Sequence, residues 1–528
     1  MNISRHFHAF SLSVLGFLFV FGPGAGPEML SAQTSTIITD EDALFGDAAP
    51  DTLAPGPAPA AGAADAAQSS AGVVSAASAS SASSAGAASS SSAVSAFLTR
   101  DQVRIGGSFT GKLGTSFTWT NPWEGNRDPL NPDKSTLDPA IASTLFFDAR
   151  PQEDLRFYGS IKTAWPFTNS ATFLTDATYV ELPSPSVTTK SASFSTVNLQ
   201  VFELFTDFSW NDAAYFRFGK HTVKWGVGYF FSPADVLNLT SIDVTNPTAQ
   251  REGPISLRAL LPIPGSQNNL WGYLLLPGAL PSGSTSGETE AFKPQDLAYA
   301  GKGEFLLGNW EIGLGAYYKN DKAPRLITTA TGSLGRFDLF AEAVASWGND
   351  RQYVTSLTPT PAFESRDDRW YFQGTAGFLY TARDGYTSIA AQYYFNGEGY
   401  SYEERENLIN QYTALPQTLQ DSLAPVLGGL LYGASQHYGA LSISRSELFI
   451  KDVSASILVM ANLADLSGFI TPSLNYKVFK YMNLSLSPTF VWYIDALWGT
   501  GKNSEYILVN KGPALTISLS AALGSGRF

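Results

Sequence analysis

Hydrophobic and polar residues alternate with a period of two over long stretches of the chain beyond residue 100. In the first stretch, 103–119, one face carries Val103, Ile105, Phe109, Leu113, Phe117 and Trp119, and the other carries Arg104, Ser108, Thr110, Lys112, Ser116 and Thr118. A period of two is typical of a β-strand whose two faces meet different surroundings. Strands this long exceed those of soluble sandwiches. The pattern therefore predicts an all-β fold, a transmembrane antiparallel β-barrel with lipid outside and water inside.

The same reading along the whole chain predicts eighteen strands. They fall at 103–119, 141–150, 154–166, 194–210, 213–225, 255–263, 268–277, 296–307, 310–320, 324–335, 336–347, 370–382, 386–399, 436–448, 452–462, 469–481, 483–496 and 511–527. Every second connection is tight, and most of the others are long, an asymmetry that outer-membrane barrels show. A barrel of sixteen strands is the alternative if 255–277 forms a loop insertion.

Aromatic residues gather near the predicted strand ends, where the boundaries of a bilayer would fall. They are Trp119, Trp123, Trp165, Phe167, Trp225, Tyr229, Phe230, Phe231, Trp347, Trp370, Tyr371, Tyr393, Tyr394, Phe395, Trp492 and Tyr493. This placement predicts interfacial girdles. The general preference of aromatic residues for strands accounts for part of it as well.

The first hundred residues have a different character. Residues 9–21 form an apolar run behind Arg5 that is too short to span a membrane, so 1–32 are expected to be a secretory signal peptide. Residues 33–99 are rich in alanine and serine, and they are expected to form a disordered linker in the periplasm. The barrel domain then covers 100–528. Export followed by a barrel predicts a bacterial outer-membrane location.

Composition removes several classes of function. The chain has no cysteine, which excludes disulfides, thiolate nucleophiles and iron–sulfur clusters. Its net charge of -13 argues against a nucleic-acid partner, because phosphates require an excess of basic residues. The histidines of the expected mature chain, His221 and His437, show no catalytic or metal-ligand spacing. The sequence therefore predicts no enzyme, no metal and no cofactor.

The chain ends in an amphipathic stretch that closes on an aromatic residue. Leu515, Ile517, Leu519, Ala521 and Leu523 alternate with Thr516, Ser518 and Ser520 before the terminal Phe528. Such an end resembles the signal by which the barrel-assembly machinery recognises outer-membrane proteins. Phe528 is out of phase with the apolar residues before it, and a β-bulge at Gly524 or Gly526 would restore the phase.

Two segments resemble stretches of uncharacterised porin-like outer-membrane proteins of diderm bacteria. They are FGKHTVKWGVGY at 218–229, followed by SPADVLN at 232–238, and QYYFNGEGY at 392–400. The resemblance implies a barrel and does not name a substrate.

In a barrel of this size the lumen is wide enough for water, so selectivity needs inward charges or an inward loop. The long segment 226–254 is the candidate constriction, with Asp235, Asp243, Arg251 and Glu252 as its charged groups. An outer loop with solvated charges fits the same residues equally well. Residues 402–411 and 419–431 have helical character and are expected either to cap the pore or to lie on its surface. The side chains expected to face the lumen are Arg104, Lys112, Arg156, Lys162, Arg217, Lys302, Glu304, Glu311 and Glu342.

These observations predict an outer-membrane, porin-like channel for diffusion of small polar solutes or ions. The alternatives are an outer-membrane transporter for hydrophobic compounds, against which the many inward serines and threonines argue, and a surface adhesin or structural barrel. The expected partners are outer-membrane lipid, small solutes and the assembly machinery. The sequence leaves the oligomeric state open.

Overall fold

The chain folds into a closed antiparallel barrel. The computed structural model describes residues 103–527 except 123–127, 129, 181–185, 212, 278–292, 358–361, 418, 421–422, 424–430, 494–504, 507–512 and 524–525. The predicted signal peptide, the linker, Trp123 and Phe528 lie outside the described residues. None of the helices in the described part of the chain is long and apolar enough to cross a bilayer.

Neighbouring strands in the sequence are also neighbours in the sheet. The first ten are β1 (Val103–Thr120), β2 (Lys134–Gln152), β3 (Leu155–Val180), β4 (Ser186–Trp210), β5 (Ala214–Lys220), β6 (Ile255–Pro262), β7 (Asn269–Leu275), β8 (Ala298–Leu307), β9 (Trp310–Lys319) and β10 (Arg325–Leu334). The barrel continues with β11 (Phe337–Trp347), β14 (Trp370–Thr381), β15 (Thr387–Asn396), β16 (His437–Arg445), β17 (Val453–Asn462), β18 (Ser467–Phe479), β19 (Met482–Tyr493) and β20 (Ala514–Leu523). β1 pairs with both β2 and β20, so the described strands close into an eighteen-strand barrel.

The prediction of eighteen strands is confirmed. The sixteen-strand alternative is wrong, because β6 and β7 pair with each other and with β5 and β8 as full members of the sheet. Several strand ends differ from the prediction. β3 and β4 are longer and pair as far as Val180 and Ser186. β5 ends at Lys220, five residues before the predicted end at 225.

The two faces of the strands differ as the alternation predicts. Along β11, Phe337, Leu339 and Trp347 point away from the side occupied by Phe340 and Glu342, and Phe337 and Trp347 are exposed. Outside the barrel, exposed apolar side chains recur on strand after strand, including Leu113, Leu314, Leu326, Phe372, Leu474 and Leu519. A continuous apolar exterior on a closed sheet fits a hydrocarbon environment, because every backbone group is paired within the barrel.

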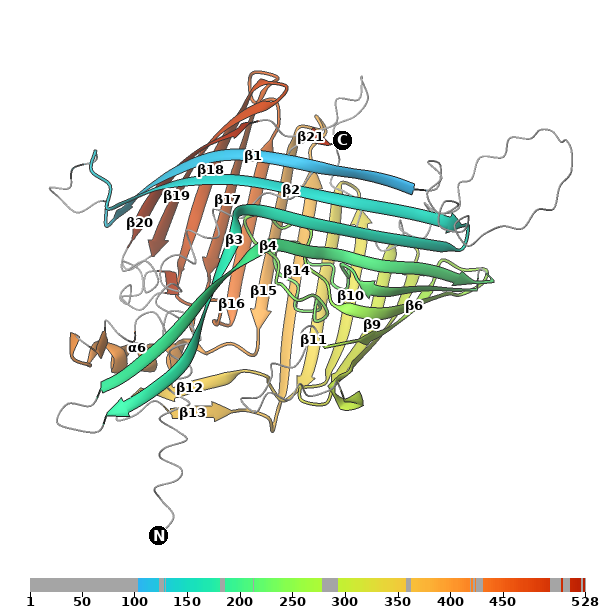
Figure 1. Ribbon diagram of the computed structural model, residues 1–528, viewed down its shortest axis with the longest axis horizontal. Helices are drawn as coiled ribbons and strands as arrows, with labels where there is room; N and C mark the ends of the chain where they lie inside the picture. The colour runs from blue at the N-terminus through green and yellow to red at the C-terminus, as the bar shows by residue number, and fades with distance from the viewer. Residues whose placement is uncertain are drawn as a thin grey trace, which may run out of the picture.

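The two ends of the barrel are unlike (Figure 1). At the end that we call the turn end, short connections join β2 to β3, β8 to β9 and β10 to β11. The opposite, loop end carries the long connections, with the hairpin of β12 (Gln352–Ser356) and β13 (Ala362–Ser365) and the helix α6 (Tyr402–Thr413). A 3-10 turn, η1 (Pro294–Asp296), precedes β8. The helix predicted at 402–411 is therefore confirmed, whereas most of 419–431 lies outside the described residues.

The register at the C-terminal end contains the extra residue that the phase of the sequence requires. Lys112 pairs with Ala522 on β20, and Phe109 pairs with Gly526 on β21 (Gly526–Arg527). From Phe109 to Lys112 is three residues on β1, whereas from Ala522 to Gly526 is four residues on the paired C-terminal segment. One residue is therefore inserted between Ala522 and Gly526. This is the β-bulge predicted at the glycines.

Candidate functional site

Residues 221–254, which we call the inner segment, leave the sheet at the end of β5 and lie inside the ring of strands (Figure 1). Both ends of the inner segment bond to β4. The backbone N–H of Thr222 donates to Glu203 at 3.2 Å, and Gln200 donates to Glu252 at 2.8 Å. The segment therefore begins and ends at the same part of the barrel wall.

Glu342 on β11 holds the middle of the inner segment. Its carboxylate accepts hydrogen bonds from the backbone N–H groups of Val227, Gly228 and Ala234 and from the hydroxyl of Ser232, at 2.6 Å for Gly228 and 2.9 Å for Ala234. A side chain at position 226 would meet the carboxylate, since a Cβ there would lie 2.6 Å from its Oε1. Glycine at 226 thus permits the close approach of the chain to Glu342.

Gln392 on β15 holds the next turn of the inner segment. Its side-chain oxygen accepts from the backbone N–H groups of Tyr229, Phe230 and Phe231, and its amide donates to the carbonyl of Phe231 at 2.6 Å. The ring of Phe231 stacks on Tyr394 with centroids 5.3 Å apart. β5 and β15 lie eight places apart in the eighteen-strand order, through β6 to β11 and then β14, so the segment spans the lumen.

An apolar cluster fills the space between the inner segment and the wall of β7, β8, β10 and β11. Its members are Val223, Trp225, Ala234 and Leu237 from the segment and Tyr273, Leu275, Ala298, Ala300, Ile327 and Val344 from the strands. Trp225 is 1% exposed and Phe230 is 2% exposed. The predicted strand over 221–225 is therefore wrong, and so is the placement of Trp225 and 229–231 in a bilayer girdle. The alternation of Val223 and Trp225 reflects packing inside the barrel, whereas Trp165, Trp347 and Trp370 do face outward.

Towards the loop end, the inward face of β17–β19 carries the apolar side chains of Leu458, Met460, Phe469 and Val491. The turn-end part of the inward face of β16–β20 is polar and remains partly exposed, in contrast to the buried inward face of β8–β11. We call it the hydroxyl wall. Its members are Ser442 and Ser444 on β16, Ser454 and Ser456 on β17, Thr471, Ser473 and Asn475 on β18, Ser485, Ser487 and Thr489 on β19, and Thr516, Ser518 and Ser520 on β20. Between the strands these groups bond in pairs, for example Thr471 with Thr489 and Ser473 with Ser487, both at 2.9 Å.

Charged side chains line the inward face of β2–β5, and they pair with one another. Arg156 donates to Asp148 at 2.8 Å and lies 3.6 Å from Asp207, which in turn accepts from Arg217 at 2.6 Å. The guanidinium of Arg217 also lies 4.0 Å from the centre of the Phe205 ring. Positive and negative groups alternate along this row, so their fields largely cancel at a distance.

The structure places the four predicted constriction residues in three positions. Asp235 and Arg251 form an ion pair within the inner segment, and the Asp235 side chain is 2% exposed. Glu252 pairs with Lys220 at the base of the segment. Asp243 lies apart, in a turn where it accepts from the backbone N–H of Thr245 at 2.9 Å. The four charges therefore do not meet across one opening.

The predicted lumen-facing residues all lie on the polar faces of their strands. Arg156 and Arg217 belong to the charged row, and Glu342 anchors the inner segment. Lys302 bonds to the Trp225 carbonyl at 3.2 Å and lies 2.9 Å from Glu304, beneath the segment. The remaining four, Arg104, Lys112, Lys162 and Glu311, occupy the same faces, and Lys162 lies over the Phe202 ring.

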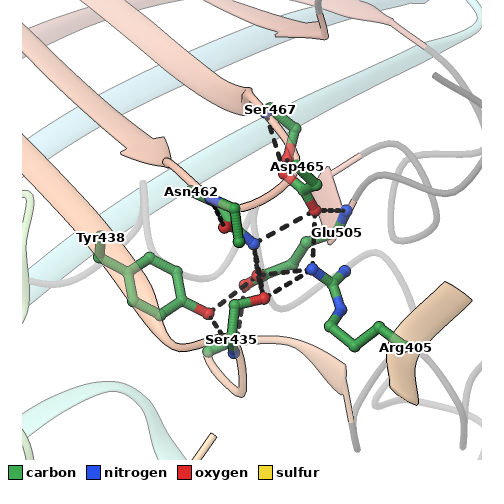
Figure 2. A network of polar contacts seen from close by, with 9 residues as sticks. Arg405, Ser435, Tyr438, Asn462, Asp465, Ser467 and Glu505 are labelled. Atoms are coloured by element: carbon green, nitrogen blue, oxygen red, sulfur yellow. Dashed lines mark hydrogen bonds and ion pairs between the residues drawn. The ribbon is translucent and has the colours of Figure 1, made fainter. Parts of the chain in front are cut away.

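A buried polar network ties the loops together at the loop end (Figure 2). Arg405 of α6 donates to Ser435 at 2.6 Å and to Asp465 at 2.8 Å. Glu505 accepts from the Gly433 backbone at 2.6 Å and from Asn462 and Tyr438. Arg405 is 2% exposed and Glu505 is 1% exposed. We call residues 350–357, 362–366, 400–413, 431–436 and 505–506 the loop-end cap.

The cap also contains an apolar core and a half-buried ion pair. Tyr353, Tyr400, Leu408 and Ile409 pack together between α6 and the β12–β13 hairpin. Arg366 donates to Glu404 at 2.6 Å, and Ser401 caps the helix through Glu404. Hydrogen bonds to Ser401 and Arg366 hold the pKa of Glu404 below its ordinary value, against the effect of its burial.

Burial raises the pKa of the Glu505 carboxyl above its ordinary value, in spite of the nearby Arg405, because Asp465 already compensates that cation. A raised pKa in the folded state makes the protonated form the stable one. The stability that Glu505 gives the cap is then complete at low pH and is lost as pH rises through its raised pKa. We expect protease resistance of the cap to fall over that range.

The variant Glu505→Gln tests this titration, since glutamine mimics the protonated carboxyl. Its cap should lie within about 1 kcal/mol of the wild type at low pH and lose the pH dependence. Limited proteolysis across a pH series measures both. Unchanged pH dependence in the variant would assign the effect to a titratable group other than Glu505.

Sequence reasoning missed Gln392 and the network of Arg405, Asp465 and Glu505. Gln392 lies in one of the segments that carried the family resemblance, yet no local pattern marks it as a partner for a loop more than 150 residues away. The glycines at 226 and 228 were a usable signal, because paired glycines indicate close approach of backbone to another group. In the part of the chain that the structure describes, no group of His, Asp or Glu residues is arranged to hold a metal.

Comparison with known proteins gives matches of structure only. No family model matches the sequence, and no curated protein matches it. OccAB4 of Acinetobacter baumannii aligns with 81% of this chain and 99% of its own, at 9% identity and a TM-score of 0.41. OccK3 (OpdO) of Pseudomonas aeruginosa aligns with 80% of this chain and 96% of its own, at 12% identity and a TM-score of 0.40. The outer membrane protein opdK of P. aeruginosa aligns with 80% of this chain and 99% of its own, at 9% identity and a TM-score of 0.39.

This similarity carries no conclusion about the family of the chain. At these identities it does not indicate which solute the chain handles. The expected resemblance to outer-membrane barrel proteins is confirmed at the level of fold by the closed eighteen-strand sheet.

Proposed function

We propose that the protein is a channel of the bacterial outer membrane through which small polar solutes diffuse. The observation that carries the proposal is the inner segment, which is fixed across the lumen and leaves the hydroxyl wall partly exposed. Solutes would pass between the inner segment and the strands β16–β20 and β1–β4. An inward loop that narrows a wide barrel is how such a channel limits solute size.

The position of the apolar inward residues separates this function from transport of hydrophobic compounds. Tyr273, Leu275, Ile327 and Val344 are buried beneath the inner segment, where a passing solute does not meet them. The surface left for a solute carries mainly hydroxyl groups and paired charges, beside the stacked rings of Phe146, Tyr158 and Phe205 on β2–β4. A hydrophobic solute would gain little there, because it would remove those polar groups from water without giving them new hydrogen-bond partners.

The remaining site assignments belong to the same proposal. We propose that Asp235, Arg251, Glu252 and Asp243 set the ion preference at the inner segment. Asp235 is paired with Arg251 and Glu252 with Lys220, whereas Asp243 lies in a turn where it accepts from Thr245. The C-terminal strands β20 and β21 would be the contact for the assembly machinery. No enzymatic step forms part of the proposal; His221 and His437 bond to the Gly219 carbonyl and to the Tyr393 hydroxyl.

Single-channel conductance of the purified full-length protein in planar bilayers tests the proposal. We expect stable steps in potassium chloride, because water-filled lumen remains beside the inner segment. Removing single charges at Asp235, Asp243, Arg251 and Glu252 should then shift the reversal potential under a salt gradient. Silence from protein whose electrophoretic mobility shows a folded, heat-modifiable barrel would refute the channel.

A further inference from the structure

We propose that the hydroxyl wall makes this channel selective for uncharged solutes rich in hydroxyl groups, with small sugars as the representative class. The inference rests on the proposed channel function and names its substrate class. Three observations carry it: the chemistry of β16–β20, the pairing of charges on the opposite strands, and the burial of the other inward groups by the inner segment.

The hydroxyl wall offers both hydrogen-bond donors and acceptors over a continuous surface. Thr471 and Thr489 share one hydrogen bond, as do Ser473 and Ser487, while Ser485 donates to Asn475 at 2.6 Å. Each hydroxyl has one donor and two acceptor positions, so a paired hydroxyl keeps capacity for a further partner. The wall is therefore a row of pre-oriented groups that can replace the water of a sugar hydroxyl at small cost.

Away from its turn end, the wall provides no countercharge for an ion. On the inward face of β16–β20, as far as the structure describes it, the charged side chain is Lys477, beside the turn after β18. An ion that moves along this wall loses part of its hydration without gaining an opposite charge. A neutral solute of the same size does not bear that cost.

The opposite side of the lumen does not reverse this preference. Asp207 lies between Arg156 and Arg217, and Asp148 bonds to Arg156, so these basic groups are already compensated. Within the inner segment Arg251 pairs with Asp235. The acidic and basic groups of this row are thus committed to one another, and the hydroxyl wall is the neutral part of the lumen surface that distinguishes solutes. Arg104, Lys112 and Lys162 are further basic groups on the inward faces of β1 and β3.

Liposome swelling with the full-length protein tests the inference. Glucose, gluconate and glucosamine share a six-carbon frame and differ in charge. Isosmotic solutions of the three allow their swelling rates to be compared directly. We expect glucose to enter several-fold faster than either charged compound. The fourfold variant Thr471→Val, Ser473→Ala, Ser487→Ala and Thr489→Val removes two bonded hydroxyl pairs, and it should slow glucose about fivefold relative to gluconate.

Two control variants separate the role of hydroxyl groups from that of packing. Thr328→Val changes a threonine on the exposed, outward face of β10, and its swelling rates should equal those of the wild type. Thr471→Ser with Thr489→Ser keeps both hydroxyls and should keep the glucose rate. This pair remains informative if the fourfold variant fails to form a heat-modifiable barrel.

The outcomes distinguish the preference for neutral solutes from the channel function on which it rests. Faster entry of gluconate or glucosamine than of glucose would refute the neutral-solute preference while leaving the channel intact. An unchanged glucose-to-gluconate ratio in a folded fourfold variant would refute the role of the hydroxyl wall. Absence of swelling with all three compounds, together with absence of conductance, would refute the channel function itself.

Discussion

Replacement of Glu342 by alanine should release the inner segment and produce a larger, noisier single-channel conductance. The carboxylate accepts from three backbone N–H groups and from Ser232, all within the turn 227–234. Each buried donor left without its acceptor costs about 1–3 kcal/mol, so docking of this turn should weaken by about 3 kcal/mol or more. With Gln392 as the remaining anchor, the turn would leave the wall for part of the time.

The control is Glu311→Ala on β9, which removes a carboxylate of the same charge from the neighbouring inward face. Glu311 makes no hydrogen bond or ion pair with the described residues of the inner segment, so its removal should alter ion preference slightly without adding noise. Glu342→Gln should be intermediate, because one oxygen remains while the amide group faces donors. A quiet, unenlarged conductance in Glu342→Ala would show that Gln392 and the apolar cluster hold the segment without it.

Most of the barrel was predictable because a period of two reports directly on two different environments. The pattern shows that one face of a strand is apolar, but it does not show which medium the apolar face meets. The predicted strand 213–225 included Val223 and Trp225, and Trp225 was assigned to a girdle at the bilayer boundary. In the structure their apolar partners are Ile327, Val344 and other inward residues.

The candidate site was predictable in outline and not in its contacts. The length and charge of 226–254 made it the candidate constriction, with an outer loop as an equal alternative. The groups that hold it, Glu342 and Gln392, lie on strands far along the chain, and the closure of the barrel alone brings them to the segment. The same holds for Asp235 and Arg251. The sequence shows that their charges are opposite, but only the folded structure shows that they pair with each other.

Replacement of Arg405 by alanine should open the loop-end cap while leaving the barrel folded. Arg405 is the cation of a buried network with two carboxylates, Asp465 and Glu505. Its removal leaves Asp465 buried without a countercharge, which costs about 3–5 kcal/mol. Hydrogen exchange of α6 should accelerate strongly, and the cap should become sensitive to protease, while heat-modifiable mobility is retained.

Arg369→Ala is the matched control, because Arg369 pairs with Asp368 on the surface, where the two side chains are 56% and 83% exposed. Such a pair contributes about 0–1 kcal/mol, so hydrogen exchange of α6 should not change. Protection in Arg405→Ala equal to that of the control would show that the apolar core of Tyr353, Tyr400 and Leu408 holds the cap by itself.

A double variant shows whether the free-energy cost of Arg405→Ala comes from the buried Asp465 carboxylate that is left without a countercharge. Arg405→Met with Asp465→Asn removes both members of the ion pair and leaves Glu505, whose raised pKa favours the neutral form. If the loss in Arg405→Ala arises from a stranded carboxylate, the double variant should be more stable than either single change, since no buried charge is left unpaired. Additive losses would instead assign the stability of the cap to the individual hydrogen bonds of Arg405 and Asp465.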